Sequence, residues 1–102
     1  MIFVEDHGFQ KRRKGVMEDE ELFRLLEWLA AHPESGKVIL GSGGLPKIRW
    51  AAKGHGKRCR ARVIYFWGTS ADRILLLDIY AKGEQENLAV AEIEELKRKV
   101  KL

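Results

Sequence analysis

The sequence predicts a single α+β domain that spans residues 1–102. Three observations predict this class: a leucine stripe at helical spacing in the first third, strand-forming runs in the middle, and a second amphipathic stretch at the end. With 45% apolar residues, the chain can build one hydrophobic core and is unlike collagen-like, low-complexity or wholly disordered sequences. No apolar run approaches the length of a membrane span, and residues 1–5 lack the features of a signal peptide. We therefore expect a cytoplasmic protein.

A short strand and a short helix are predicted at the start of the chain. Residues 2–4 are Ile, Phe and Val, which favour an extended conformation. Asp6 is placed to cap a basic helical segment over residues 9–14, which Gly15 ends.

A longer helix is predicted from Glu18 onward. It begins with an acidic first turn that suits the helix dipole. Its apolar positions recur at i, i+3, i+4 and i+7, namely Leu22, Leu25, Leu26 and Leu29. The helix is expected to end at His32, because the residue before Pro33 is disfavoured in helical dihedrals. A connector is then expected up to Gly44.

Strands dominate the second half of the prediction. They cover residues 45–50, 61–67 and 73–81. Because a turn over residues 68–72 joins the last two, these strands are expected to pair antiparallel. A C-terminal helix is predicted from the helical spacing of Ile93, Leu96 and Val100.

Alternation in these strands predicts a polar cleft on one face of the sheet. Lys47 and Arg49 share one face of their strand, and Ile48 and Trp50 share the other. The last strand is expected to turn three residues toward the helices, Leu75, Leu77 and Ile79. Its opposite face then carries Leu76, Asp78, Tyr80 and Lys82.

Basic residues gather in the middle of the chain. Residues 37–71 hold eight basic and no acidic side chains, whereas residues 1–36 hold five basic and eight acidic ones. A solvated surface usually mixes the two signs, so this segregation favours a polyanionic partner, most simply nucleic acid. A merely solvated cationic face is the alternative.

Three other features of the sequence are weaker indications of function. Residues 41–44 are rich in glycine, but no Gly-Lys-Ser/Thr follows and a strand comes next, so we expect a connector rather than a phosphate-binding loop. Cys59 is the single cysteine and lacks zinc-site spacing with histidines, so it is expected to be an incidental thiol. We expect neither a metal nor a cofactor. His55 lies in the basic stretch and could exchange protons near neutral pH, or simply be an exposed loop residue.

The remaining constellation consists of charged and polar strand residues: Lys47, Arg49, Arg62, Tyr80 and Lys82. Crowded cations suit phosphodiester cleavage in RNA, because they stabilise the phosphorane and lower the pKa of a neighbouring lysine. Phosphate binding without chemistry is the alternative. The side of Arg62 stays open, because its face also carries Ile64 and Phe66, and it could instead pack on Trp67 or pair with Asp78.

Three segments carry a family resemblance: LPKIRWAAKGHGKR at 45–58, ARVIYFW at 61–67 and IYAKGEQENL at 79–88. With the IFVE opening, they make the chain resemble HigB-type toxins of the RelE superfamily over nearly its whole length. The resemblance implies a RelE-like fold, a small antiparallel sheet with two N-terminal helices packed on it and a C-terminal helix. It also implies a toxin of a type II toxin–antitoxin system, a metal-independent mRNA interferase that cleaves mRNA on the ribosome and inhibits translation.

Site residues follow from the resemblance position by position. The catalytic set that it implies is Lys47, Arg49, Arg62, Lys82 and Glu84. The remaining basic and polar residues are assigned to RNA and ribosome binding: Lys53, His55, Lys57, Arg58, Arg60 and Tyr80. The general base stays open, because some relatives place a tyrosine after the last strand and none follows Tyr80 here.

The resemblance also implies partners. They are the ribosome with its mRNA and a cognate antitoxin that carries a DNA-binding module; no membrane is expected. Two alternatives stay open: a ParE-like toxin that acts on gyrase without cleaving RNA, and a non-catalytic nucleic-acid-binding relative.

Overall fold

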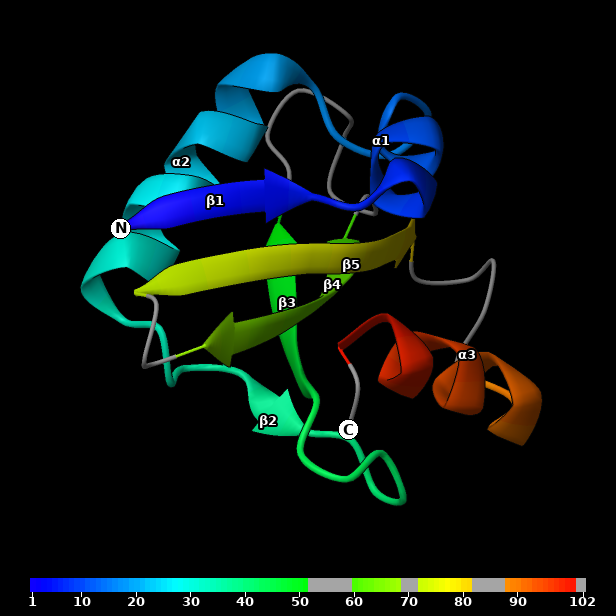
Figure 1. The fold of residues 1–102 in the computed structure, drawn as a ribbon. Coiled ribbons are helices and arrows are strands. Elements are labelled where there is room, and N and C mark those ends of the chain that lie inside the picture. Colours follow the sequence, from blue (N-terminus) through cyan, green and yellow to red (C-terminus); the bar gives the residue numbers. More distant parts are fainter. Residues whose placement is uncertain (52–59, 69–71, 82–87, 101–102) are drawn as a thin grey trace.

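The computed structural model describes residues 1–51, 60–68, 72–81 and 88–100. In these ranges the chain forms a mixed five-stranded sheet and three helices, with strand order β1-β5-β4-β3-β2 (Figure 1). The predicted α+β class is confirmed. The elements are β1 (Ile2–Glu5), α1 (His7–Arg13), α2 (Asp19–Ala31), β2 (Lys37–Val38), β3 (Pro46–Ala51), β4 (Arg60–Gly68), β5 (Arg73–Ala81) and α3 (Val90–Val100). Over the described part of the chain, none of the helices has the length and apolarity needed to cross a membrane.

The N-terminal strand makes the sheet mixed, which corrects the expected antiparallel sheet. β1 pairs with β5 in parallel, with Val4 opposite Leu75. A parallel neighbour needs a long crossover, and here two helices and three strands separate the pair along the chain. Asp6 then caps α1 as predicted, accepting a hydrogen bond from the Gly8 N–H at 2.9 Å.

The expected connector before β3 contains the short strand β2 and a tight turn. β2 pairs antiparallel with β3 at the edge of the sheet. Ser42 closes the turn: its hydroxyl donates to the Ile39 carbonyl at 2.6 Å and accepts from the Leu45 N–H at 2.9 Å. Three glycines with positive φ allow this path, Gly41, Gly43 and Gly44. The glycine-rich segment therefore connects β2 to β3 and does not lead into a helix.

One face of the sheet is closed by α1 and α2. The predicted leucine stripe is confirmed, because Leu22, Leu25 and Leu29 are buried there together with Phe9 of α1. They pack on strand residues that include Ile48, Val63, Tyr65 and Ile79. This is the larger of the two apolar clusters.

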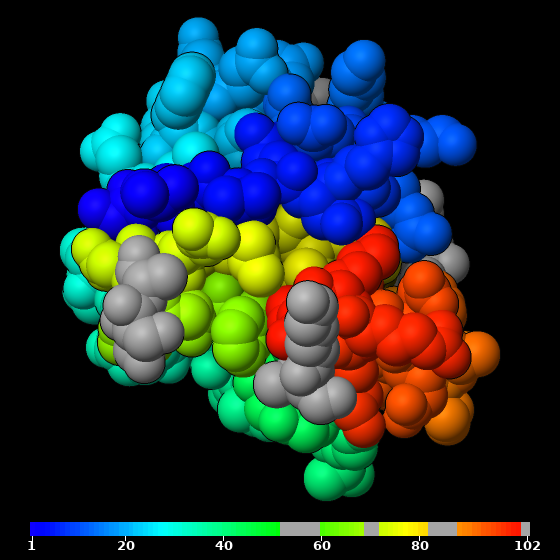
Figure 2. All heavy atoms as spheres, viewed as in Figure 1, coloured from blue at the N-terminus to red at the C-terminus, as the bar shows by residue number. Residues whose placement is uncertain are grey.

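The other face is covered in part by α3. Leu96 of α3 packs with Leu45, Ile64, Leu77 and Tyr80 in a second apolar cluster. At its end, α3 meets the N-terminal segment through an ion pair of 2.8 Å between Lys99 and Asp6. Figure 2 shows this contact, where the end of α3 (red) adjoins the blue N-terminal segment.

A β-bulge changes which residues of β5 face which side. The pairing of β4 with β5 shifts by one residue and skips Leu77. Leu75 and Leu77 consequently pack with α3, and Leu76 packs with α1 and α2, so the prediction for these three residues was wrong. The strict period of two fails because the extra residue reverses the alternation. Beyond the bulge, Ile79 faces α1 and α2 and Tyr80 faces α3, as predicted.

Candidate functional site

Strand register aligns the predicted site residues across the sheet. Arg49 lies directly opposite Arg62, and Arg62 lies directly opposite Tyr80, so β3, β4 and β5 each contribute one residue to a single row. Lys47 lies two positions from Arg49 on β3 and therefore shares its face. The structure thus brings together the four described members of the constellation, on the α3 side of the sheet.

Arg62 is almost fully buried on β4. It is 8% exposed, and within the described ranges its buried Nη1 has no hydrogen-bond partner. Asp78, the expected structural alternative, instead accepts from Arg12 of α1, with Nη1–Oδ1 and Nη1–Oδ2 distances of 3.0 Å. A buried N–H group without a hydrogen-bond partner is costly, because it loses its hydration on burial. The Arg62 Nη1 can therefore donate a hydrogen bond to a bound anion.

Tyr80 places a second unmet polar group beside Arg62. Its buried hydroxyl has no hydrogen-bond partner in the part of the chain that the structure describes. Burial raises the pKa of Tyr80; Asp78 and Glu92 raise it further, whereas Arg62 and Arg49 lower it. The phenol stays protonated near neutral pH and can donate a hydrogen bond to a bound anion.

Lys47 holds its charge in unfavourable surroundings. Burial is the largest cause that lowers its pKa, and the charges of Arg62 and Arg49 lower it further. The sequence predicted the direction of this shift from charge repulsion, while the structure adds partial burial as the larger cause. A lysine with a lowered pKa gives up its proton more readily, which suits proton exchange.

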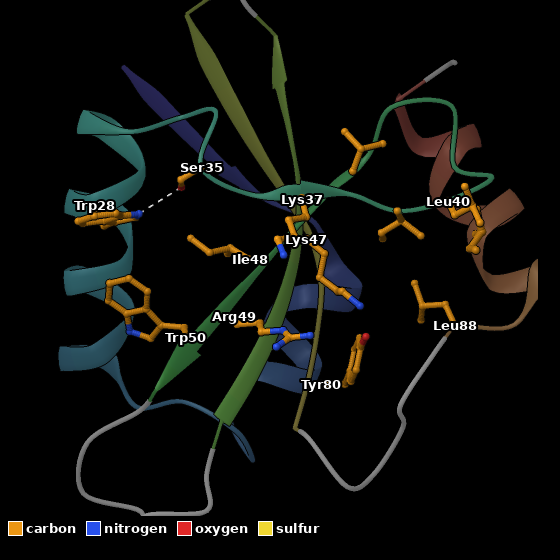
Figure 3. Close-up of a pocket in the computed structure, with 13 residues that line it drawn as sticks. Trp28, Ser35, Lys37, Leu40, Lys47, Ile48, Arg49, Trp50, Tyr80 and Leu88 are labelled. Carbon is orange, nitrogen blue, oxygen red and sulfur yellow. Dashed lines mark hydrogen bonds between the residues drawn. The ribbon is translucent and has the colours of Figure 1, made fainter.

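These residues adjoin a pocket of about 800 Å³ (Figure 3). Lys47, Arg49 and Tyr80 line its cationic middle, while Trp28 and Trp50 line the side next to α2. The remaining walls come from the turn before β2, from β2 with the residues after it, from β3 and from the α3 region: Ser35, Lys37, Val38, Ile39, Leu40, Ile48, Leu88 and Ile93. Arg62 is not a lining residue, but it lies between two of them, Arg49 and Tyr80, in the row.

A hydrogen-bonded turn fixes the wall that β2 contributes. The hydroxyl of Tyr65 donates to the Pro33 carbonyl at 2.8 Å and accepts from the Gly36 N–H at 2.9 Å. A Cβ atom at Gly36 would lie 2.8 Å from that hydroxyl oxygen, so only glycine permits this approach. Tyr65 therefore joins the chain entering β2 to the centre of the sheet.

Trp28 and Glu21 are among the residues of the site that sequence reasoning did not identify. Trp28 lines the pocket, and buried Glu21 accepts a hydrogen bond of 3.0 Å from the Trp50 Nε1 and pairs with Arg24. A signal for Glu21 was available, since it lies four residues before Leu25 and continues the apolar stripe of α2. Trp28 stands at the edge of the same stripe, where an aromatic residue can be half exposed.

Several residues singled out in the sequence analysis lie outside the described residues. These are Lys53, His55, Lys57, Arg58, Cys59, Lys82 and Glu84, whose roles stay predictions. Arg60 is described: it is the first residue of β4, pairs with Ala51 and is exposed, so it belongs to the sheet rather than to a loop.

Comparison with protein-family models finds no match for this chain. The chemistry of the site is therefore inferred from its own residues. Within the described ranges, no group of three His, Cys, Asp or Glu side chains could hold a metal ion. What the arrangement offers is concentrated positive charge and a phenol donor beside a pocket, which together suit the binding of an anion such as a phosphodiester.

Proposed function

We propose that this protein is a toxin that cleaves mRNA on the ribosome, as its resemblance to HigB-type toxins of the RelE superfamily implies. One observation carries the proposal: Arg49 and Arg62 lie opposite each other on neighbouring strands, and next in the row is Tyr80, whose hydroxyl has no hydrogen-bond partner among the described residues. Like charges placed directly opposite one another repel. A phosphate held at this row removes the repulsion and satisfies the unpaired groups.

Cleavage needs three events at the scissile phosphate. A general base takes the proton of the 2′-hydroxyl, whose oxygen attacks phosphorus. The phosphorane gains negative charge, and an acid then gives a proton to the 5′-oxygen as its bond to phosphorus breaks. Arg49 and Arg62 stabilise the phosphorane, and the strands hold them in place. Lys47, with its lowered pKa, is the candidate proton donor to the 5′-oxygen. Lys82 and Glu84 stay predicted members of this set.

The ribosome and an antitoxin complete the proposal. So small a domain has few elements from which to build an RNA channel, and the ribosome supplies orientation of the substrate. Naked RNA is therefore expected to be a poor substrate. A cationic pocket also favours an acidic or amphipathic antitoxin segment, whose association slows as salt rises.

Primer extension on cellular transcripts after brief induction tests the proposal. Cuts at fixed codon positions in translated transcripts, absent when Arg62→Met is induced, support it. Intact transcripts together with altered plasmid supercoiling would instead favour a gyrase-directed, ParE-like toxin. Intact transcripts with normal supercoiling would favour a non-catalytic nucleic-acid-binding protein.

A further inference from the structure

Two tryptophans form an aromatic corner at one side of the pocket. The rings of Trp28 and Trp50 have centroids 6.5 Å apart and planes inclined by 51°. In Figure 3 the indole of Trp50 is seen face on and that of Trp28 nearly edge on, both on the side of α2. Trp28 is 42% exposed, a large value for an aromatic residue at a pocket wall. The corner is therefore open to a ligand.

The polar atoms of this aromatic corner already have partners. The Trp28 Nε1 donates to the Ser35 Oγ at 3.1 Å, and the Trp50 Nε1 donates to buried Glu21 at 3.0 Å. Trp28 also stacks on His32, with ring centroids 4.0 Å apart. These contacts hold both indoles in place and leave ring surface, rather than hydrogen-bonding groups, for a ligand.

Cations adjoin the aromatic corner in the same pocket. Lys47 and Arg49 line the pocket from the α3 side of β3, and Trp50 extends from the α2 side of the same strand. Lys37 of β2 lies directly opposite Lys47. Aromatic faces beside a cationic track are what single-stranded nucleic acid requires, because bases stack while phosphates pair with the charges. An apolar protein segment would pack on the rings, but it would leave the facing cations Lys37 and Lys47 without a counter-charge.

We propose that the aromatic corner binds one unpaired nucleobase of the RNA, in contact with the rings of both Trp28 and Trp50. The base belongs to a nucleotide next to the phosphate held by Lys47 and Arg49. The inference rests on the proposed function, to which it adds a base-binding subsite. A pocket of about 800 Å³ lies within the usual range for small-molecule sites and has room for a nucleotide.

NMR titration with an uncleavable single-stranded RNA tests the subsite without any need for turnover. The probes are a 2′-O-methylated pentaadenylate and an abasic ribose-phosphate pentamer of equal charge. The pentaadenylate should move the indole resonances of Trp28 and Trp50, and its own adenine protons should shift upfield. The abasic pentamer should bind about five- to tenfold more weakly, since stacking on one aromatic residue is worth at least about that factor.

Matched substitutions on α2 separate stacking from folding. Trp28→Leu should weaken pentaadenylate binding about fivefold, and Trp28→Phe should restore most of it. Phe23 is the control: it lies on the same helix, is 63% exposed and does not line the pocket, so Phe23→Leu should leave binding unchanged.

Each remaining outcome overturns a defined claim. Equal affinity for the two pentamers, unchanged binding by Trp28→Leu, or no RNA binding at all overturns the base subsite. If an antitoxin peptide, and not RNA, shifts the indole resonance of Trp28, the aromatic corner binds a protein partner instead. Base-dependent binding combined with intact cellular transcripts would keep the subsite and overturn the nuclease instead.

Discussion

The two faces of the sheet serve different ends. The face under α1 and α2 is closed by apolar side chains, among which Phe9, Leu25 and Leu29 are fully buried. The face under α3 is apolar only in part, and its remainder holds the charged row. A single strand serves both faces: Ile48 of β3 is buried with α1 and α2, Lys47 lies on the opposite side, and both line the pocket. The larger apolar cluster thus lies on one face and the charged row on the other.

The charged face is less stable than it could be. The pKa of Lys47 is lowered, and the buried Nη1 of Arg62 has no hydrogen-bond partner in the described part of the chain, so both groups destabilise the folded protein. An anion would offset that cost on binding. The closed face also has a buried polar atom without a partner in the described ranges, the Trp67 Nε1, but the cations that face each other lie on the α3 side. This contrast in charge predicts how substitutions on the two faces differ.

The largest stability effect is expected on the closed face. Phe9→Ala should lower the free energy of unfolding by about 3–5 kcal/mol, because it leaves a cavity beneath α1. Leu96→Ala, on α3 beside the pocket, should cost about 2 kcal/mol, the lower end of the range for such truncations. Urea denaturation measures both. Equal losses would show that the two faces contribute alike.

Filling the space beside the Tyr65 hydroxyl should have the next largest effect on stability. Gly36→Ala places a Cβ 2.8 Å from the Tyr65 hydroxyl oxygen and should cost about 1–3 kcal/mol through overpacking. Gly15 is the matched control, since a Cβ there meets nothing within 4 Å. Thermal melts should show Gly36→Ala well below the wild type and Gly15→Ala close to it. A neutral Gly36→Ala would mean that the turn into β2 is adaptable.

Breaking the ion pair between Arg12 and Asp78 should cause a smaller loss of stability. Burial raises the pKa of Asp78, and Arg12 is the largest cause that lowers it. Arg12→Met should therefore raise that pKa further and cost about 1–2 kcal/mol at pH 7, between the values for buried and exposed pairs. The deficit should shrink as the pH falls through the pKa of Asp78, because the protonated acid needs no partner.

The control for this pair is an exposed one on α3. Arg98 pairs with Glu95 three residues earlier, and both side chains are largely exposed. Arg98→Met should change the stability by less than about 0.5 kcal/mol at any pH. A pH-independent loss in Arg12→Met would point to lost packing of its aliphatic stem instead.

The smallest effect is expected to be a gain in stability on the charged face. Lys47→Met should raise the stability at pH 7 by up to about 1 kcal/mol, since it removes a charge that burial and two arginines disfavour. Because the folded-state pKa lies below the ordinary 10.5, the penalty is fully present below the folded pKa and fades as the pH approaches 10.5. Lys11→Met, at an exposed position of α1, should show no such gain. Calorimetry from pH 7 to 10 measures the difference.

Local patterns predicted much of this architecture. The spacing of Leu22, Leu25 and Leu29 predicted α2 and its buried face, and Asp6 predicted the start of α1. Alternation placed Lys47 and Arg49 together, because a strand without irregularities follows the period of two.

What the sequence did not reveal depends on long-range pairing. The parallel partner of β1 lies some 70 residues away, and no local pattern specifies it. The bulge at Leu77 reversed the faces of three residues, and nothing in the alternating run of β5 marks it. The aromatic corner likewise joins Trp28 of α2 to Trp50 of β3, which only tertiary packing brings together.

The most direct test of the central claim compares the wild type with Arg62→Met in mRNA cleavage on programmed ribosomes, with a thermal melt of each protein. Losing one positioned charge at a developing phosphorane should slow cleavage by about 10²–10³-fold. Because Arg62 is buried and its Nη1 has no hydrogen-bond partner among the described residues, the melting temperature should stay the same or rise. Cleavage at the wild-type rate, or a melt several degrees lower together with lost activity, would contradict a phosphate-binding role for Arg62.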